Sequence, residues 1–286
     1  MISPGSQHIQ TDSMQEDDAL NAKPTLNTPH TAVGIIAPVA VAVAVVAVWQ
    51  TFVWVNDVSP LVLPSPLQVC FALINERADL VEAAWCTTYA ALTGLTASTL
   101  IGVLTAFAFS QSRTVRRTFY PYAILLQTVP IIAVAPIIVI SFGRGFYSVA
   151  LVSLVISLFP IITNTTTGLL QIDARHRELF ELHSATWWQT LWKLRLPSSL
   201  PYLISGVRIA GGAAIVGAIV GEFFVGSSQP GLGAMIQKKA AGIAMDELFA
   251  TVFVSTILGV TIFGIITVIG ERILKRFFGM SLSGVR

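Results

Sequence analysis

The residues of this chain whose types could do chemistry are few and scattered. Arg208 and Glu222 are ionisable groups in a long apolar stretch, where such groups are by default candidates for a role in transport. Both lie near the ends of that stretch, so their charges could instead reach the lipid headgroups. Cys70 and Cys86 could form a disulfide, although inert buried thiols are favoured. The sequence has no Ser/His dyad, paired aspartates or HExxH helix, so it offers no catalytic set for an intramembrane enzyme.

The composition identifies a membrane protein. Of the 286 residues, 54% are hydrophobic and only 11% are charged, which is less than half the charged fraction of an ordinary soluble domain. The net charge of +2 shows no basic excess of the kind that nucleic-acid binding requires. Because a helix needs about 20 apolar residues to cross the hydrocarbon, we expect an all-α membrane protein with about six transmembrane helices. They are predicted at 32–55, 84–109, 119–142, 146–168, 202–225 and 249–271.

The termini are predicted to lie in the cytoplasm. Most lysines and arginines between the predicted spans fall on one side of the membrane, and an excess of these residues marks the cytoplasmic loops. Residues 1–31 lack apolar side chains to bury and are predicted to be a disordered tail. Because this tail is long and acidic, the span after it is interpreted as a retained anchor and not as a signal peptide. The transmembrane domain is predicted at 32–275, with a C-terminal cytoplasmic tail at 276–286.

The third predicted span is polar and interrupted. It contains Gln127, Thr128, Pro130 and Pro136, and the polar run 163–167 shortens the fourth span. Prolines within a span are tolerated where neighbouring groups or cavity water satisfy the freed carbonyls. The region is therefore expected to face protein or a substrate pathway, and a purely structural kink is the alternative.

Small residues recur at helical spacing between 206 and 221, on two adjacent faces of the predicted fifth span. Such faces permit close approach of helices in lipid. They indicate either ordinary packing within one subunit, or a wall of the pathway or a seam between two copies. The pathway candidates are Gln127, Thr128, Pro130, Pro136, Gly217, Gly221 and Glu222.

Residues 173–197 are predicted to form a helical hairpin between two spans. Asp173 is a suitable N-cap for a first helix from about 174 to 183. Thr186 and Gln189 have the spacing of a capping box, which predicts the start of a second helix. The two residues between these helices are expected to interrupt the chain's helical conformation.

The second half of this hairpin is rich in tryptophan and ends in Leu-Pro. Trp187, Trp188 and Trp192 form either an aromatic belt at the headgroups, packing of the hairpin on the spans, or a contact surface for a partner. Leu196 is expected to leave the helical region because Pro197 follows it.

The hairpin resembles the coupling motif of ABC-importer permeases, the "EAA" loop, in which Glu-Ala-Ala is followed by Gly and then by Leu-Pro. Residues 178–180 occupy the first three positions, with Leu and Phe in place of both alanines. Ser184 occupies the Gly position, and Leu196 with Pro197 the terminal pair. If the turn needs a positive φ, the serine costs about 1 kcal/mol relative to glycine.

Three further blocks extend the resemblance over about residues 55–275. They are similar to the nitrate, sulfonate, taurine and pyrimidine-precursor branch of these permeases. The blocks are LVLPSP (61–66), QTVPIIAVAPIIVISFG (127–143) and LPSSLPYLISGVRIAGGAAIVGAIVGEFF (196–224).

The resemblance implies a type I ABC importer (MetI-like) fold in the bacterial inner membrane. Two identical permease copies would form the pathway as a homodimer, and an extracytoplasmic binding protein would deliver the solute. The hairpin would dock on a cytoplasmic ATPase through Glu178, Leu179, Phe180, Ser184, Ala185, Trp188, Leu191, Leu196 and Pro197. The solute would be hydroxymethylpyrimidine, riboflavin, nitrate, a sulfonate or taurine.

The energy source is expected on another polypeptide. The sequence has no G-x-x-x-x-G-K-[ST] segment to cradle nucleotide phosphates, so ATP and magnesium would bind the ATPase and this chain would hold no cofactor or metal. The alternative is an ion-coupled secondary transporter acting alone, which would require inverted repeats and ionisable residues at the midplane.

Overall fold

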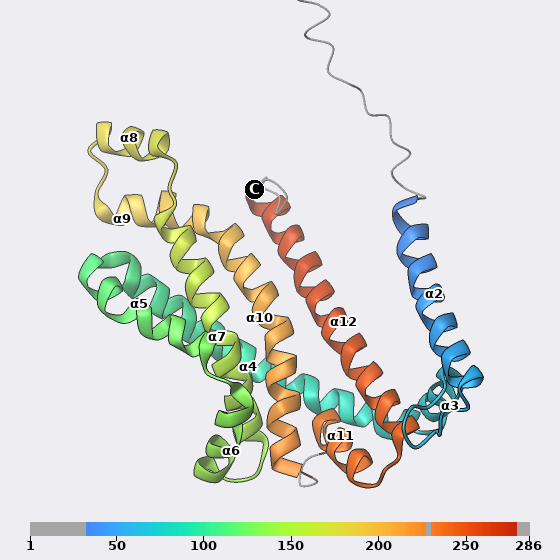
Figure 1. The fold of residues 1–286 in the computed structure, drawn as a ribbon. Coiled ribbons are helices and arrows are strands. Elements are labelled where there is room, and N and C mark those ends of the chain that lie inside the picture. The colour runs from blue at the N-terminus through green and yellow to red at the C-terminus, as the bar shows by residue number, and fades with distance from the viewer. Residues whose placement is uncertain (1–32, 227–229, 279–286) are drawn as a thin grey trace, which may run out of the picture. The chain divides into compact units, whose positions relative to one another are not determined.

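The computed structural model describes residues 33–226 and 230–278, and this part of the chain is built from helices (Figure 1). The predicted tail at 1–31 and most of the predicted tail at 276–286 lie outside the described residues. The all-α prediction is confirmed. The elements are α2 (Val33–Val55), α3 (Pro66–Asn75), α4 (Arg77–Gln111), α5 (Arg113–Thr128), α6 (Ile131–Phe142), α7 (Phe146–Leu170), α8 (Ala174–Leu182), α9 (Trp187–Thr190), the π-helical turn η1 (Leu191–Arg195), α10 (Leu196–Val225), α11 (Leu232–Ala241) and α12 (Met245–Phe278).

Five of the described helical segments are long and apolar enough to cross a membrane. They agree with five of the predicted spans and comprise Ile36–Val55, Arg77–Gln111, Phe146–Leu170, Trp187–Val225 and Met245–Arg276. The predicted span 119–142 is instead a pair, α5 and α6, bent by 97°. The number of spans is therefore six if this pair crosses the membrane as one unit.

Proline chemistry explains the break between α5 and α6. Val129 and Pro130 both have extended backbones, with φ/ψ of −70°/121° and −67°/107°. Pro130 disfavours a helical conformation at the residue before it and has no N–H to continue the helix. Pro136 lies inside α6 and does not end it.

The centre of the fold from residue 52 onward is the contact of α7 with α4 and α10. Ser153 on α7 donates a hydrogen bond to the Ala214 carbonyl of α10 at 2.9 Å, and its Oγ also lies 3.4 Å from the Ala91 carbonyl of α4. A Cβ on Gly94 would lie only 2.6 Å from the Ala150 carbonyl oxygen. A small residue is therefore required for the close approach of α4 and α7.

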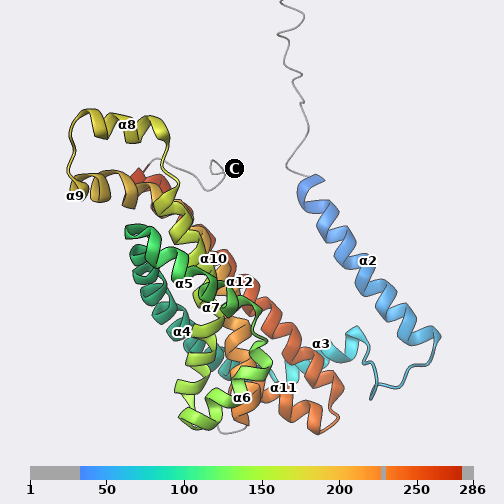
Figure 2. The ribbon, with the colours of Figure 1, turned by 60° about the vertical axis from the view of Figure 1, so that its left-hand side comes forward.

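Two short helices, α3 and α11, lie at the end of the bundle opposite the hairpin (Figure 2). Neither was predicted, because each has only ten residues, about half of what a membrane span needs. Ser65 and Gln68 start α3 with a capping box. The prediction of inert buried thiols is wrong for Cys70, which is exposed on α3, and Cys86 on α4 is half-buried; both are free.

An ion-pair network, formed by Lys239, Glu76 and Glu247, joins α11 to the start of α4 and to α12. The Lys239 ammonium lies 3.0 Å from Glu76 and also contacts Glu247. Burial alone would lower the pKa of Lys239, but hydrogen bonds and charge from Glu247 and Glu76 outweigh it and raise the pKa. The network therefore favours the charged lysine.

Glu222 fastens α11 to the same end of the bundle. Its carboxylate is only 2% exposed and accepts hydrogen bonds from the Thr87 hydroxyl and the Gly233 N–H, both at 2.9 Å. The Thr87 hydroxyl in turn accepts one from the Leu232 N–H at 2.9 Å. Glu222 does not reach the headgroups, since the groups that satisfy it belong to α4 and α11.

The hairpin and the C-terminal end of α12 lie together at the other end of the bundle (Figures 1 and 2). This arrangement is the one required if both face the cytoplasm. It places the hairpin at the ends of two central helices, α7 and α10.

Candidate functional site

The first half of the hairpin is an exposed helix, α8. The Asp173 carboxylate accepts a hydrogen bond from the Arg175 N–H at 3.0 Å, which confirms the predicted N-cap. Arg177 and Glu181 form an ion pair at 2.9 Å on the solvent side. No residue of α8 is buried, so its apolar side chains are available for contact with another molecule.

A Schellman motif ends α8, and it contains the most informative residue of the hairpin. The Ala185 N–H donates to the Phe180 carbonyl and the Ser184 N–H donates to the Glu181 carbonyl, both at 3.0 Å. Ser184 has a φ of +47°. The turn therefore does require the left-handed conformation, which explains why glycine suits this position of the motif and why serine is costly there.

The second half of the hairpin runs without interruption into a spanning helix. Thr186 and Gln189 form the predicted capping box. The prediction that Leu196 leaves the helix is wrong, because its φ/ψ of −64°/−49° are helical. The π-helical turn, in which the Leu196 N–H donates to the Leu191 carbonyl, precedes the proline. Pro197 then occupies the first turn of α10, where its missing N–H is tolerated.

The side chains of this second half point in two directions. Leu191 is 1% exposed and packs inside the fold, so the predicted contact surface of the hairpin does not include it here. Trp188 is 62% exposed and Trp192 is 65% exposed. Leu196 and Pro197 line a hollow of about 260 Å³ together with Trp192 and with residues of α4 and α7.

A groove of about 400 Å³ separates α8 from α9. Three predicted contact residues, Leu179, Phe180 and Ala185, line it. The other lining residues are His183, Gln189 and Lys193. Lys193 was predicted at the polar rim of the docking surface and His183 as a surface or interface residue, whereas Gln189 was not predicted as a contact residue. The capping box was the sequence feature from which the position of Gln189 could have been inferred, because it fixes which side of α9 faces α8. Glu178 is exposed on α8 outside the lining.

A second and larger hollow, of about 530 Å³, lies beside the break between α5 and α6. Gln127 is the predicted pathway residue that lines it, whereas Thr128, Pro130 and Pro136 do not. Thr128 instead donates a hydrogen bond to the Leu125 carbonyl of its own helix at 2.9 Å. The lining residues that were not predicted include Asn164, whose signal was the polar run at 163–167.

The other pathway candidates lie elsewhere. A Cβ on Gly217 would lie 2.8 Å from the Ser153 Cα, and one on Gly221 would lie 3.0 Å from the Val149 Cα. Both glycines therefore serve the packing of α10 on α7 in this structure. Glu222 follows them and holds α11.

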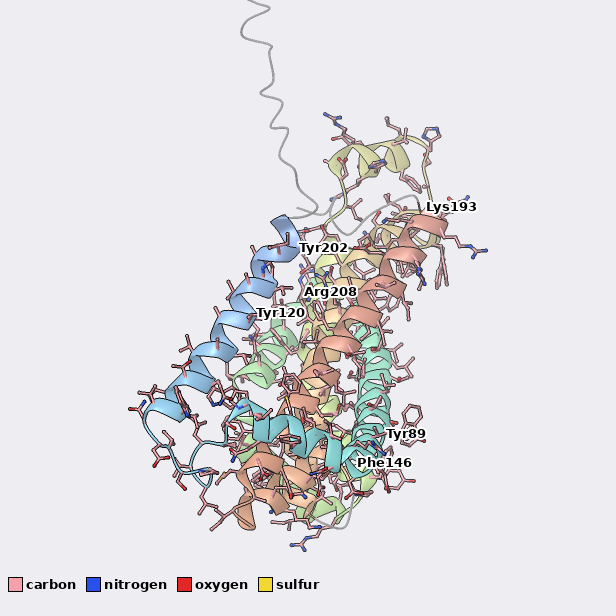
Figure 3. The ribbon with its side chains drawn as sticks, turned by 90° about the vertical axis from the view of Figure 1, so that its right-hand side faces the viewer. Tyr89, Tyr120, Phe146, Lys193, Tyr202 and Arg208 are labelled. Carbon is pink, nitrogen blue, oxygen red and sulfur yellow. The ribbon has the colours of Figure 1, made fainter. Side chains whose placement is uncertain are left out.

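Arg208 is the ionisable residue closest in sequence to the larger hollow, but it turns toward α12. Its guanidinium lies over the Phe263 ring, 5.4 Å from the centroid. Figure 3 shows Lys193, Tyr202 and Arg208 in succession from the hairpin end inward. The Tyr202 hydroxyl donates to the Gln171 side chain at 2.9 Å and so ties the start of α10 to the end of α7.

Comparison with known families identifies this arrangement. The model of the family "binding-protein-dependent transport system inner membrane component" matches residues 98–278, a segment that includes the hairpin, both hollows, α7, α10 and the C-terminal part of α4. The chain belongs to this family. It is an ABC importer permease subunit, which confirms the resemblance found in the hairpin and the three sequence blocks.

Individual permeases of the family are similar over most of their length. The formylaminopyrimidine transport permease protein ThiX of Halalkalibacterium halodurans is 34% identical over 70% of this chain and 80% of its own. The riboflavin transport system permease protein RibX of Chloroflexus aurantiacus is 30% identical over 80% of this chain and 85% of its own. The putative aliphatic sulfonates transport permease protein SsuC of Bacillus subtilis is 26% identical over 85% and 86%. The chain thus lies in the nitrate, sulfonate and taurine branch of the permeases.

Proposed function

We propose that this chain works as a pair of identical copies, between which a small solute moves inward across a bacterial inner membrane. An extracytoplasmic binding protein delivers the solute. A separate cytoplasmic ATPase, which holds ATP and magnesium, docks on the hairpin and supplies the energy. The chain itself is not an enzyme, and its termini face the cytoplasm.

The continuity of α9, η1 and α10 is the observation that carries this proposal. A rigid element that connects a docking surface directly to a spanning helix can transmit the motion of a partner into the membrane. The buried Leu191 and Leu194 anchor the turn between the two helices in the fold. A push on the hairpin is therefore expected to move the inner end of α10.

The docking surface in this proposal is the exposed side of α8 together with the groove beside α9. Leu179 is 50% exposed and Leu182 is 82% exposed, which leaves apolar surface for a partner to cover. The ion pair of Arg177 and Glu181 would lie at the polar rim of the interface. Glu178 and Trp188 border the same region, whereas Leu191, Leu196 and Pro197 hold the hairpin to the bundle.

The experiment is co-purification of the permease with its ATPase after substitution of Leu179 and Leu182 by Asp. Burial of one leucine contributes about 1.5–3 kcal/mol, so loss of both is expected to weaken the complex about 100-fold or more. Leu61→Asp is the matched control, because Leu61 is 63% exposed and lies outside the hairpin. Membrane insertion should be equal in all variants.

Two results would overturn the proposal. One is an undiminished amount of co-purified ATPase in the double hairpin variant. The other is uptake of solute without ATP by the purified chain alone, which is the behaviour of an ion-coupled secondary transporter.

The solute is proposed to belong to the classes that the relatives' names print. These are a formylaminopyrimidine and riboflavin on one side, and aliphatic sulfonates and taurine on the other. Measurement of which of these compounds the partner binding protein retains would identify the solute.

A further inference from the structure

The larger hollow beside the α5–α6 break has a composition that bears on what can pass it. It is lined from α5 and α6, from α7, and from Ile209 of α10. None of its twelve lining residues carries a charge. Its volume of about 530 Å³ falls within the usual range of small-molecule sites, roughly 300–1,000 Å³.

Part of the backbone at the break is already paired, since the Val129 N–H donates to the Leu125 carbonyl and the Ala133 and Val134 N–H groups donate to the Pro130 carbonyl. The remaining groups at the break need a polar environment. The first N–H groups of a helix have no partner within the helix, and no side chain caps the start of α6. The last carbonyls of α5 lie at the same break. Hydrocarbon cannot satisfy these groups, so irregular backbone within a span must face protein or a water-filled cavity. Val129 and Ile131, which flank the break, both line the hollow.

The two helix ends also balance each other electrically. The start of α6 presents a partial positive charge, which alone would favour an anion. The end of α5 presents a partial negative charge at the same break, only two residues away along the chain. The pair therefore offers hydrogen-bond donors and acceptors together and carries no net attraction for either sign.

The polar side chains of the hollow repeat this pattern. Gln127 on α5 and Asn164 on α7 both end in amides, which donate and accept hydrogen bonds. Asn164 is held by a hydrogen bond from its Nδ2 to the Pro160 carbonyl at 2.8 Å. Phe159 contributes an aromatic ring to the wall, and flat rings stack favourably on such a surface.

A charged solute would find no counter-ion among the lining residues. Burial of an unpaired charge is strongly unfavourable, and bound sulfonates or phosphates are usually met by Arg or Lys. Arg208, next to the lining residue Ile209, instead stacks on the Phe263 ring of α12.

We propose that this hollow is a transit site for an uncharged, flat heteroaromatic solute, bound by the amides of Gln127 and Asn164 and by stacking on Phe159. This inference rests on the proposed function, because it assumes that the break faces the pathway. It selects the pyrimidine and flavin class over the sulfonate class.

The experiment uses the full chain in complex with its ATPase in proteoliposomes, with Cys70 and Cys86 replaced by Ser. Single cysteines are placed by Val134→Cys on α6 and Ile156→Cys on α7, which line the hollow but are not assigned to bind the solute. Ile140→Cys is the control on α6, because Ile140 is 83% exposed and does not line the hollow. The uncharged reagent methyl methanethiosulfonate and its anionic sulfonatoethyl analogue report access. Riboflavin, a formylaminopyrimidine, taurine and ethanesulfonate are the competing solutes.

The two hollow positions should react with the uncharged reagent faster than with the anionic one, and Ile140→Cys should resist the anionic reagent. A heteroaromatic solute at three times its dissociation constant should slow the reaction about fourfold by mass action. The sulfonates should have no effect. Equal protection by taurine or ethanesulfonate, protection by none of the four solutes, or no reaction in the hollow would each overturn the inference. Retention of the ATPase in the same samples separates any such result from failure of the proposed function.

Discussion

The left-handed serine at the hairpin turn gives a prediction whose size follows from the structure. Ser184 has a φ of +47°, and this conformation costs an L-residue roughly 1–2 kcal/mol. Ser184→Gly removes that cost but increases the chain's freedom when the turn opens, which offsets about 0.5–1 kcal/mol. The net stabilisation of the turn is therefore expected to be about 0.5–1 kcal/mol.

Hydrogen exchange at the Ala185 amide measures this change directly, because that N–H donates to the Phe180 carbonyl only while the turn is closed. A stabilisation of about 0.5–1 kcal/mol should slow its exchange about two- to fivefold. Ser184→Ala is the matched control: alanine has the same difficulty with positive φ and should leave exchange nearly unchanged. Equal exchange in the Gly and Ala variants would refute the assignment of strain to this backbone conformation.

Three further perturbations test the contacts that hold the bundle together. Thr87→Val should lower the thermal stability of the detergent-solubilised protein by about 1–3 kcal/mol, because it leaves the Leu232 N–H and the Glu222 carboxylate short of a partner; Thr88→Val, which loses only a bond to its own helix, should cost much less. Gly94→Ala should cost about 1–3 kcal/mol through overpacking against α7, whereas Gly259→Ala meets no atom within 4 Å and should stabilise the helix by about 0.4–1 kcal/mol. Because the pKa of Lys239 is raised in the folded state, its ion pairs stabilise the fold fully at pH values below the ordinary lysine pKa of 10.5. This stabilisation should decrease as the pH rises through the folded-state pKa. An equal melting temperature below and above that pH range would contradict the predicted loss of stability.

Hydropathy predicted the long elements because spanning lipid requires about 20 apolar residues whatever their partners are. It could not find α3 and α11, since helices of ten residues leave no such signal. The break at Pro130 was visible as a proline, but its 97° angle was not. That angle depends on how both halves pack on their neighbours.

The capping residues of the hairpin could be predicted from the sequence, but the directions in which its side chains point could not. Asp173 and Thr186 act through bonds to residues two or three positions away, so their sequence spacing is sufficient evidence. Leu191 is buried at the first position of the π-helical turn, and no local sequence pattern predicts such a turn. Leu196 is helical although Pro197 follows it. Proline disfavours a helical backbone at the preceding residue but does not forbid it, and the first turn of a helix accepts proline.

The helix α10 connects every feature to which a role has been assigned. One end of it continues the hairpin, Ile209 reaches the larger hollow, and Glu222 near the other end holds α11 through Gly233. Thirty residues of helix extend about 45 Å, which is longer than the hydrocarbon core. Pro201 removes one hydrogen bond near the start of this helix, and the hydrogen-bonded turns beyond it are expected to move largely as a unit. Displacement of those turns by the hairpin would change both the hollow and the contact with α11. The close packing of Gly217 and Gly221 on α7 then restricts such motion to sliding or rotation of α7 and α10 together.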